Sequence, residues 1–139
     1  MERERKSTSS ELELLKEWYR YNSIVRKKYL QAIFDEIPEQ ERYRDRGASF
    51  PSVVDIFMHV IDAYRSWFVY TYEDRWAEYE RLRGKKRYLR EEVESEEAKI
   101  DSLVLRFIDN LTENDLERTI AFKGQGDYRK IKMRNMLGI

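Results

Sequence analysis

The stretch SFPSVVDIFMHVIDAYRSW, residues 49–67, decides the fold class. Its apolar residues recur at spacings of three and four, which is typical of a helix with one buried face. This stripe consists of Val53, Ile56, Val60, Tyr64 and Trp67. Ser49 is a suitable N-cap, and Pro51 is tolerated in the first turn of a helix. The pattern predicts a helix that starts near Ser49, continues to about Tyr72 and turns this stripe towards the core.

A second stripe precedes this segment and predicts another long helix. Its members are five apolar residues and one amide, namely Leu15, Trp18, Asn22, Val25, Tyr29 and Ile33. Ser10 is a suitable N-cap, with Glu11 and Glu13 well placed in the first turn. Pro38 ends this helix because the residue before a proline is pushed out of the α region. Residues 1–8 are charged and polar, with little to bury, so we expect them to be disordered.

Residues 73–99 predict a charged insertion between the second and third helices. Six basic residues fall within residues 81–90, and five acids fall within residues 91–97. Gly84 is expected to break the helix between the two runs. Because neighbouring runs of opposite charge attract each other, we interpret the basic run as paired with acids rather than as a phosphate-binding surface.

The remaining segments complete the predicted architecture. A third helix carries the apolar residues Val93, Ile100, Leu103, Val104, Phe107, Ile108 and Leu111. Residues 119–122 and 128–131 predict two short strands joined by a turn over residues 123–127. Residues 132–139 predict the first turns of a further helix. We therefore predict one mainly α domain over residues 1–139, an up-and-down helical bundle of three long helices, a short extended hairpin and the start of a fourth helix.

Composition excludes several classes of function. The chain has 139 residues, with 27 basic and 27 acidic side chains, and this balance argues against a general nucleic-acid-binding protein. It has no cysteine and one histidine, so it cannot supply a thiolate nucleophile or a multi-histidine metal site from one chain. No segment approaches the roughly 18 apolar residues of a membrane span, and the charged start is unlike a signal peptide. We expect a cytoplasmic protein that does not bind membranes.

Four features resemble the DinB-like superfamily, a group of four-helix-bundle proteins also described as damage-inducible. They are Trp18 with Asn22, the segment 49–67 with its histidine, the segment 114–122, and the segment 133–137. The resemblance implies a divalent metal, zinc or nickel, bound by three histidines. His59 matches the first of these ligands, whereas the two on the family's last helix have no counterpart before Ile139. The resemblance therefore implies an incomplete metal site.

The neighbours of His59 leave two interpretations open. Asp55 and Asp62 lie four residues before and three residues after it, on one side of the same helix. The three side chains are a candidate weak metal site. Alternatively, both carboxylates are solvated surface groups, one of which orients the imidazole ring.

A ligand pocket and an interface are also expected from the helix stripes. Asn22, Trp18 and Trp67 are the candidate pocket residues, with Asn22 either facing His59 or bonding a loop backbone. Three amphipathic helices without a fourth leave an apolar groove, which is rarely left exposed on a monomer. Of the three ways to cover it, by the extended tail, by further residues or by a second chain, we favour a homodimer.

Two functions follow as hypotheses. The first is a dimeric module that binds a partner or a small ligand and retains an incomplete metal site. The alternative, which only the resemblance implies, is a metal-dependent transferase or isomerase that uses a thiol cofactor.

Overall fold

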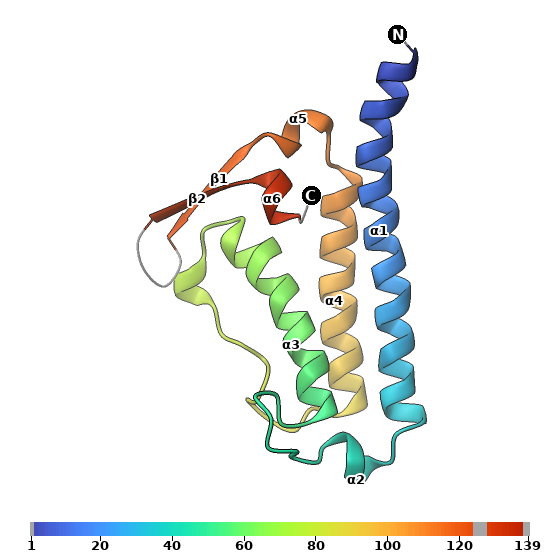
Figure 1. Ribbon diagram of the computed structural model, residues 1–139. Coiled ribbons are helices and arrows are strands. Elements are labelled where there is room, and N and C mark those ends of the chain that lie inside the picture. Colours follow the sequence, from blue (N-terminus) through green and yellow to red (C-terminus); the bar gives the residue numbers. More distant parts are fainter. Residues whose placement is uncertain (1, 124–127, 138–139) are drawn as a thin grey trace.

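The computed structural model describes residues 2–123 and 128–137 and shows a bundle of three long helices (Figure 1). These helices are α1 (Glu2–Asp35), α3 (Val53–Arg65) and α4 (Arg90–Asp109). A π-helical segment, η1 (Ser66–Thr71), continues α3 to the region where the sequence predicts its end. The predicted mainly α bundle with three long helices is confirmed.

Shorter elements connect these helices and follow them. They are α2 (Glu39–Arg42), the 3-10 turn η2 (Trp76–Glu78), α5 (Glu113–Leu116), β1 (Thr119–Lys123), β2 (Tyr128–Lys132) and α6 (Met133–Met136). The two strands pair antiparallel, with Ile120 opposite Ile131. The predicted hairpin and the start of a further helix are thus confirmed, while residues 124–127 of the predicted turn lie outside the described residues. None of the described helices is long and apolar enough to cross a membrane.

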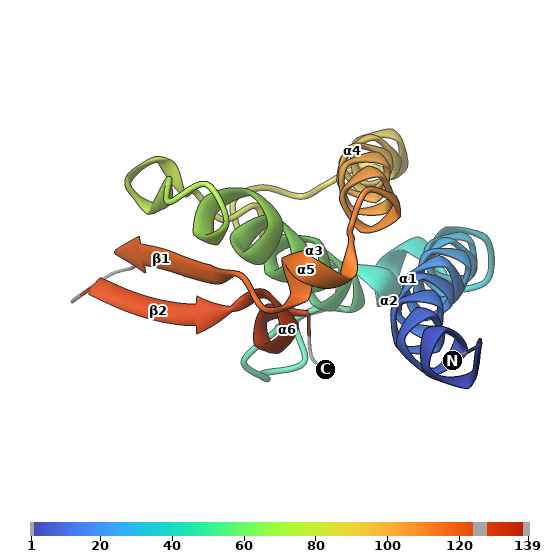
Figure 2. The same ribbon diagram turned by 90° about the horizontal axis from the view of Figure 1, so that it is seen from above.

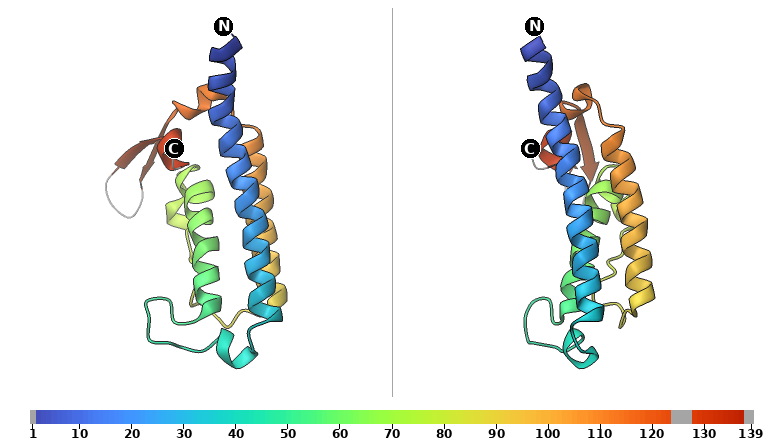
Figure 3. Two further views of the ribbon diagram at one scale, coloured as in Figure 1. Left: turned by 45° about the vertical axis from the view of Figure 1, so that its right-hand side comes forward. Right: turned by 90° about the vertical axis from the view of Figure 1, so that its right-hand side faces the viewer.

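The three long helices do not strictly alternate in direction. Figure 1 and both views of Figure 3 show α3 and α4 running the same way, with α1 antiparallel to both. Residues 72–89 run back along the length of the bundle before α4 begins, and this return allows α4 to run in the same direction as α3. The hairpin and α6 then lie at the end of the bundle where α3 and α4 finish (Figure 1).

Several predicted boundaries differ from the structure. The N-cap of α3 is Ser52, whose Oγ accepts a hydrogen bond from the Asp55 backbone N–H at 3.1 Å, so the cap lies three residues after the predicted Ser49. The acidic run 91–97 belongs to the first turns of α4, which shortens the charged connection to residues 72–89. The first helix, α1, also covers residues 2–8, where we expected disorder. Glutamate, arginine and lysine favour helix, and extending a formed helix is easier than starting one.

The basic run pairs only in part with the acidic run. Lys86 forms an ion pair with Glu92, and Arg90 forms one with Glu94 at 2.7 Å. Arg87, however, pairs with Glu39 at 3.0 Å, and Lys85 pairs with Glu80 at 2.5 Å. Acids elsewhere in the fold therefore neutralise part of this run.

On α1 and α3 the closed core uses other helix faces than those predicted, whereas on α4 the predicted residues Val93, Ile100, Val104 and Ile108 are buried. On α3 the buried apolar residues are Val54, Phe57, Met58 and Ile61, whereas Ile56 of the predicted stripe is 51% exposed. On α1, Leu15 and Ile33 are buried as expected, but Trp18 and Tyr29 are 67% and 63% exposed. The buried side of α1 instead includes Ser23 and Arg26, which bind acids of α4. Because polar residues lie on this buried face, the apolar stripe in the sequence marks a different side of the helix.

Candidate functional site

The two predicted stripes face each other across an open groove between α1 and α3. The α1/α3 groove has a volume of about 460 Å³. From α1 it is lined mainly by Asn22, Val25, Tyr29 and Ile33, and from α3 by Val53, Ile56, Val60 and Tyr64. Seen from above, α1, α3 and α4 occupy three corners of the bundle (Figure 2). The stripes that the sequence assigns to a core are therefore the walls of this groove.

Arginine and tyrosine side chains define the end of the groove nearest α6. The Arg26 guanidinium lies over the Tyr64 ring, 4.8 Å from its centroid, and both residues line the groove. Next to them Tyr19 contacts Tyr64 edge-on, and its hydroxyl donates to the carbonyl of Leu137 at 3.4 Å. Burial, together with the neighbouring Tyr64, raises the pKa of Tyr19 to about 12. Tyr19 thus remains a protonated donor that joins α1 to the end of α6.

The three candidate pocket residues have different positions. Asn22 is half-buried and lines the α1/α3 groove, whereas His59 is not among the lining residues. Trp18 and Trp67 are not among the lining residues, and both are exposed, Trp67 by 40%. The two tryptophans therefore lie on the outer surface of α1 and η1 rather than inside the groove.

His59 and its two acidic neighbours do not form a ligand set. The His59 ring is exposed and stacks on Phe50, with centroids 4.2 Å apart and planes 27° apart. The Asp55 carboxylate accepts a hydrogen bond from Ser52 Oγ at 2.9 Å, within the cap of α3. Across the described ranges 2–123 and 128–137, no group of three or more His, Cys, Asp or Glu side chains is placed to hold a metal ion.

Asp62 is a structural anchor rather than a surface acid. It is buried, and its oxygens accept the backbone N–H groups of Leu82 and Arg83, each at 2.9 Å. Arg65 completes its shell with an ion pair of 2.7 Å. A carboxylate that accepts this many hydrogen bonds from its own chain has little capacity left for a metal. The residues present in the described chain therefore do not fit the metal centre that the resemblance implies.

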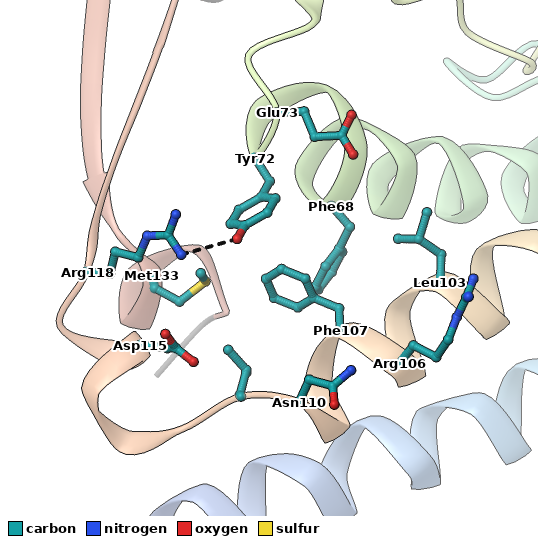
Figure 4. Close-up of a pocket in the computed structure, with 11 residues that line it drawn as sticks. Phe68, Tyr72, Glu73, Leu103, Arg106, Phe107, Asn110, Asp115, Arg118 and Met133 are labelled. Carbon is teal, nitrogen blue, oxygen red and sulfur yellow. Dashed lines mark hydrogen bonds between the residues drawn. The ribbon is translucent and has the colours of Figure 1, made fainter.

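A second pocket was missed by the sequence analysis. It lies between η1, α4 and the α5–β1 segment and has a volume of about 420 Å³ (Figure 4). Its aromatic residues are Phe68, Tyr72 and Phe107, and its arginines are Arg106 and Arg118. They come from three distant parts of the chain, and the sequence predicted Phe107 only as an ordinary core residue. Spacing within a single helix gives no signal for such a site.

The architecture identifies the class of protein. Three long helices, a long return between α3 and α4, and a hairpin leading into a further helix form a mainly α bundle without an assembled metal-ligand set in its described part. The chain belongs to the DinB family, whose family model matches residues 5–136. No curated protein sequence and no solved structure matches it. Family and fold are thus established, whereas the biochemical role has to be inferred from the surfaces of this chain.

Proposed function

We propose that this DinB-family protein is a homodimeric binding module whose α1/α3 face pairs with the same face of a second copy. The observation that carries the proposal is the apolar surface next to the α1/α3 groove. On α1 the exposed large apolar residues, which we call the α1 ridge, are Leu14, Trp18, Tyr21, Ile24 and Tyr29. Monomeric soluble proteins rarely expose large apolar patches, and such patches normally mark interaction sites.

The geometry favours a second copy over an unrelated partner. Tyr29 belongs to the α1 ridge and also lines the groove, so the projecting and the hollow parts share one face. A two-fold dimer uses the same patch on both subunits, which requires a surface that is complementary to itself. A face with both a ridge and a groove meets this requirement, because each ridge is then able to enter the partner's groove.

Length and charge are also compatible with a dimer. The α1 ridge spans residues 14–29, which corresponds to about 24 Å of helix. The groove follows α1 from Asn22 to Ile33 and continues to Ile37 just beyond the helix, so ridge and groove have comparable lengths. The chain has no formal net charge, so two copies do not repel each other through an overall charge.

A mass measurement in solution tests this proposal. Light scattering after size-exclusion chromatography is expected to give twice the chain mass of 17.1 kDa. Tyr29→Asp places a charge at the junction of ridge and groove and is expected to weaken dimerisation about 100-fold, the size of an interface hot spot. Because Tyr29 is largely exposed, the helical circular dichroism spectrum should be unchanged.

Leu89→Asp is the matched control for the dimer. Leu89 is 57% exposed at the start of α4, outside the groove and the ridge, so this variant should dimerise like the wild type. A wild type that remains monomeric at high concentration would overturn the proposal. So would a dimer that tolerates Tyr29→Asp.

The second candidate is a metal-dependent enzyme that uses a thiol cofactor. Two observations favour it, namely membership of a generally metal-associated family and the exposed position of His59. A metal would supply Lewis-acid activation of a thiol or a carbonyl. Because the described residues near His59 are engaged elsewhere, further ligands would have to come from outside this described set.

Metal content distinguishes the two candidates. We expect protein purified without metal-affinity resin to contain far less than one zinc or nickel ion per chain by mass spectrometry, with no change in His59→Ala. A full equivalent that is lost in His59→Ala would contradict this expectation and favour the enzyme. Phe50→Ala, which removes the ring stacked on His59 but no metal ligand, should leave the metal content at the wild-type level in either case.

A further inference from the structure

We propose that the pocket between η1, α4 and the α5–β1 segment binds a small organic carboxylate with an aromatic body. We call it the α4/hairpin pocket. It shares no lining residue with the α1/α3 groove, so this inference is independent of dimerisation. Figure 4 shows Phe68 and Phe107 in the middle of the pocket, with Arg118 beside Tyr72 on one side and Arg106 on the other. Three properties of these side chains support the proposal.

The first property is a preformed aromatic wall. Phe107 of α4 contacts Phe68 edge-on, with ring centroids 5.3 Å apart, and Tyr72 in the same manner at 4.9 Å. Phe68 and the neighbouring Met133 are buried, so this part of the wall is held by packing. Aromatic groups contribute a large apolar contact area with a defined geometry. The wall therefore suits a flat apolar ligand.

The second property is that the two arginines keep N–H donors available for a ligand. The Arg118 guanidinium donates to the Tyr72 hydroxyl at 3.4 Å and lies over its ring, and Arg106 donates to the Ser102 carbonyl at 3.3 Å. Neither forms an ion pair in the part of the chain that the structure describes. Each guanidinium carries five N–H donors, so both retain donors for an anion. Arginine binds a carboxylate through two parallel hydrogen bonds, which makes this anion the natural ligand.

The third property is that the acids of the pocket already have local partners. Glu73 forms an ion pair with Arg75 at 2.7 Å. Asp115 accepts from the Thr112 backbone N–H at 2.9 Å and from its hydroxyl at 3.0 Å. These hydrogen bonds, together with the charge of Arg118, hold the pKa of Asp115 below its ordinary value. The carboxylates are thus used within the fold, whereas the arginines keep donors available.

The backbone of η1 sets the position of the wall. In this segment the Tyr72 N–H bonds to the carbonyl of Trp67, five residues earlier, at 3.2 Å. Such π-helical turns are rare and occur frequently at functional sites. Here the wide turn places Tyr72 near Arg118 and Phe68 near Phe107, so that the aromatic wall and this arginine share one pocket.

Titration with 2-naphthoate tests the proposal. The ligand carries a carboxylate on a two-ring aromatic body, and a ligand of its size is expected to bind with a Kd of about 1 mM. Its uncharged analogue 2-naphthamide keeps the rings and should bind about tenfold more weakly, because a charged hydrogen bond is lost. Backbone amide shifts in NMR spectra should change in η1 and in the second half of α4.

Variants locate the site. Arg118→Gln should weaken 2-naphthoate about tenfold while leaving 2-naphthamide unchanged, and Arg106→Gln should act in the same direction. Arg81→Gln removes an exposed charge outside the pocket and should have no effect. Equal binding of acid and amide would overturn the proposal. The same conclusion follows if Arg118→Gln does not weaken the acid, or if the NMR shifts fall on the α1/α3 groove instead.

Discussion

Arg26→Met is expected to lower the free energy of unfolding by about 3 kcal/mol, because it leaves buried carboxylates without a partner. Arg26 is 7% exposed, and its guanidinium donates to Glu97 at 3.2 Å and to Asp101 at 2.9 Å. Glu97 is itself 4% exposed. Lys27 remains close to both acids, which keeps the loss at the lower end of the usual range for a broken buried pair. Urea denaturation followed by circular dichroism measures this change.

Arg20→Met is the matched control for this cluster. Arg20 forms an ion pair with Asp109 at 2.5 Å, also between α1 and α4, but both side chains are about half exposed. Its loss should cost less than about 1 kcal/mol, as is usual for exposed pairs. Combining Arg26→Met with Glu97→Leu should recover much of the stability, because no buried Glu97 charge then lacks a partner. An Arg26→Met variant as stable as Arg20→Met would contradict the assignment of a buried network.

The same cluster predicts how stability depends on pH. Burial raises the pKa of Asp101, but hydrogen bonds from Lys27 and Ser23 and the positive charges of Lys27 and Arg26 outweigh this effect and lower the pKa overall. A lowered pKa in the folded state means that the carboxylate stabilises the fold above its unfolded pKa of about 4. This stabilisation is lost as pH falls through the folded pKa. The stability advantage of the wild type over Asp101→Asn should therefore shrink when the pH is lowered from 6 towards 3.

The buried network explains why the sequence predicts the helices but not which face of α1 is buried. Apolar spacing and Pro38 are local features, and they were sufficient to place three long helices and to end the first of them close to Asp35. The buried face of α1 depends on Arg26, whose partner Glu97 lies 71 residues away. A single sequence gives no sign that these two charges meet. Hydrophobicity alone therefore favoured the side of α1 that carries Trp18 and Tyr29.

The candidate sites likewise divide into one that spacing within a helix indicates and one that depends on contacts between distant segments. Asn22 reaches the α1/α3 groove because position on one helix determines which surface it shares with Val25 and Tyr29. The α4/hairpin pocket, by contrast, requires Phe68, Phe107 and Arg118 to meet from separate elements. The spacing of Asp55, His59 and Asp62 also appeared favourable, yet each side chain has a different partner in the fold. Helical spacing indicates that residues share a face but not what that face contacts.

Asp62→Ala is expected to lower the free energy of unfolding by about 3 kcal/mol, because removing the acceptor leaves two backbone N–H groups unpaired and takes the carboxylate partner from a cation. The N–H groups belong to Leu82 and Arg83, and the cation is Arg65. Asp62→Asn keeps an oxygen in place and should lose less. Asp55→Ala is the control on the same helix, and it should cost about 1 kcal/mol because it removes one hydrogen bond at the cap.

Proteolysis gives this prediction a second measurement. The connection of residues 72–89 is tied to α3 through Asp62, so Asp62→Ala should become sensitive to trypsin near Arg81 and Arg83 under conditions where Asp55→Ala stays intact. This sensitivity follows from the position of the carboxylate at the point where the return segment passes α3. If Asp62 served a metal instead, the variant would lower metal content and leave cleavage unchanged. A carboxylate on a helix next to a histidine acts as an anchor here because the backbone that it binds comes from a segment about twenty residues further along the chain.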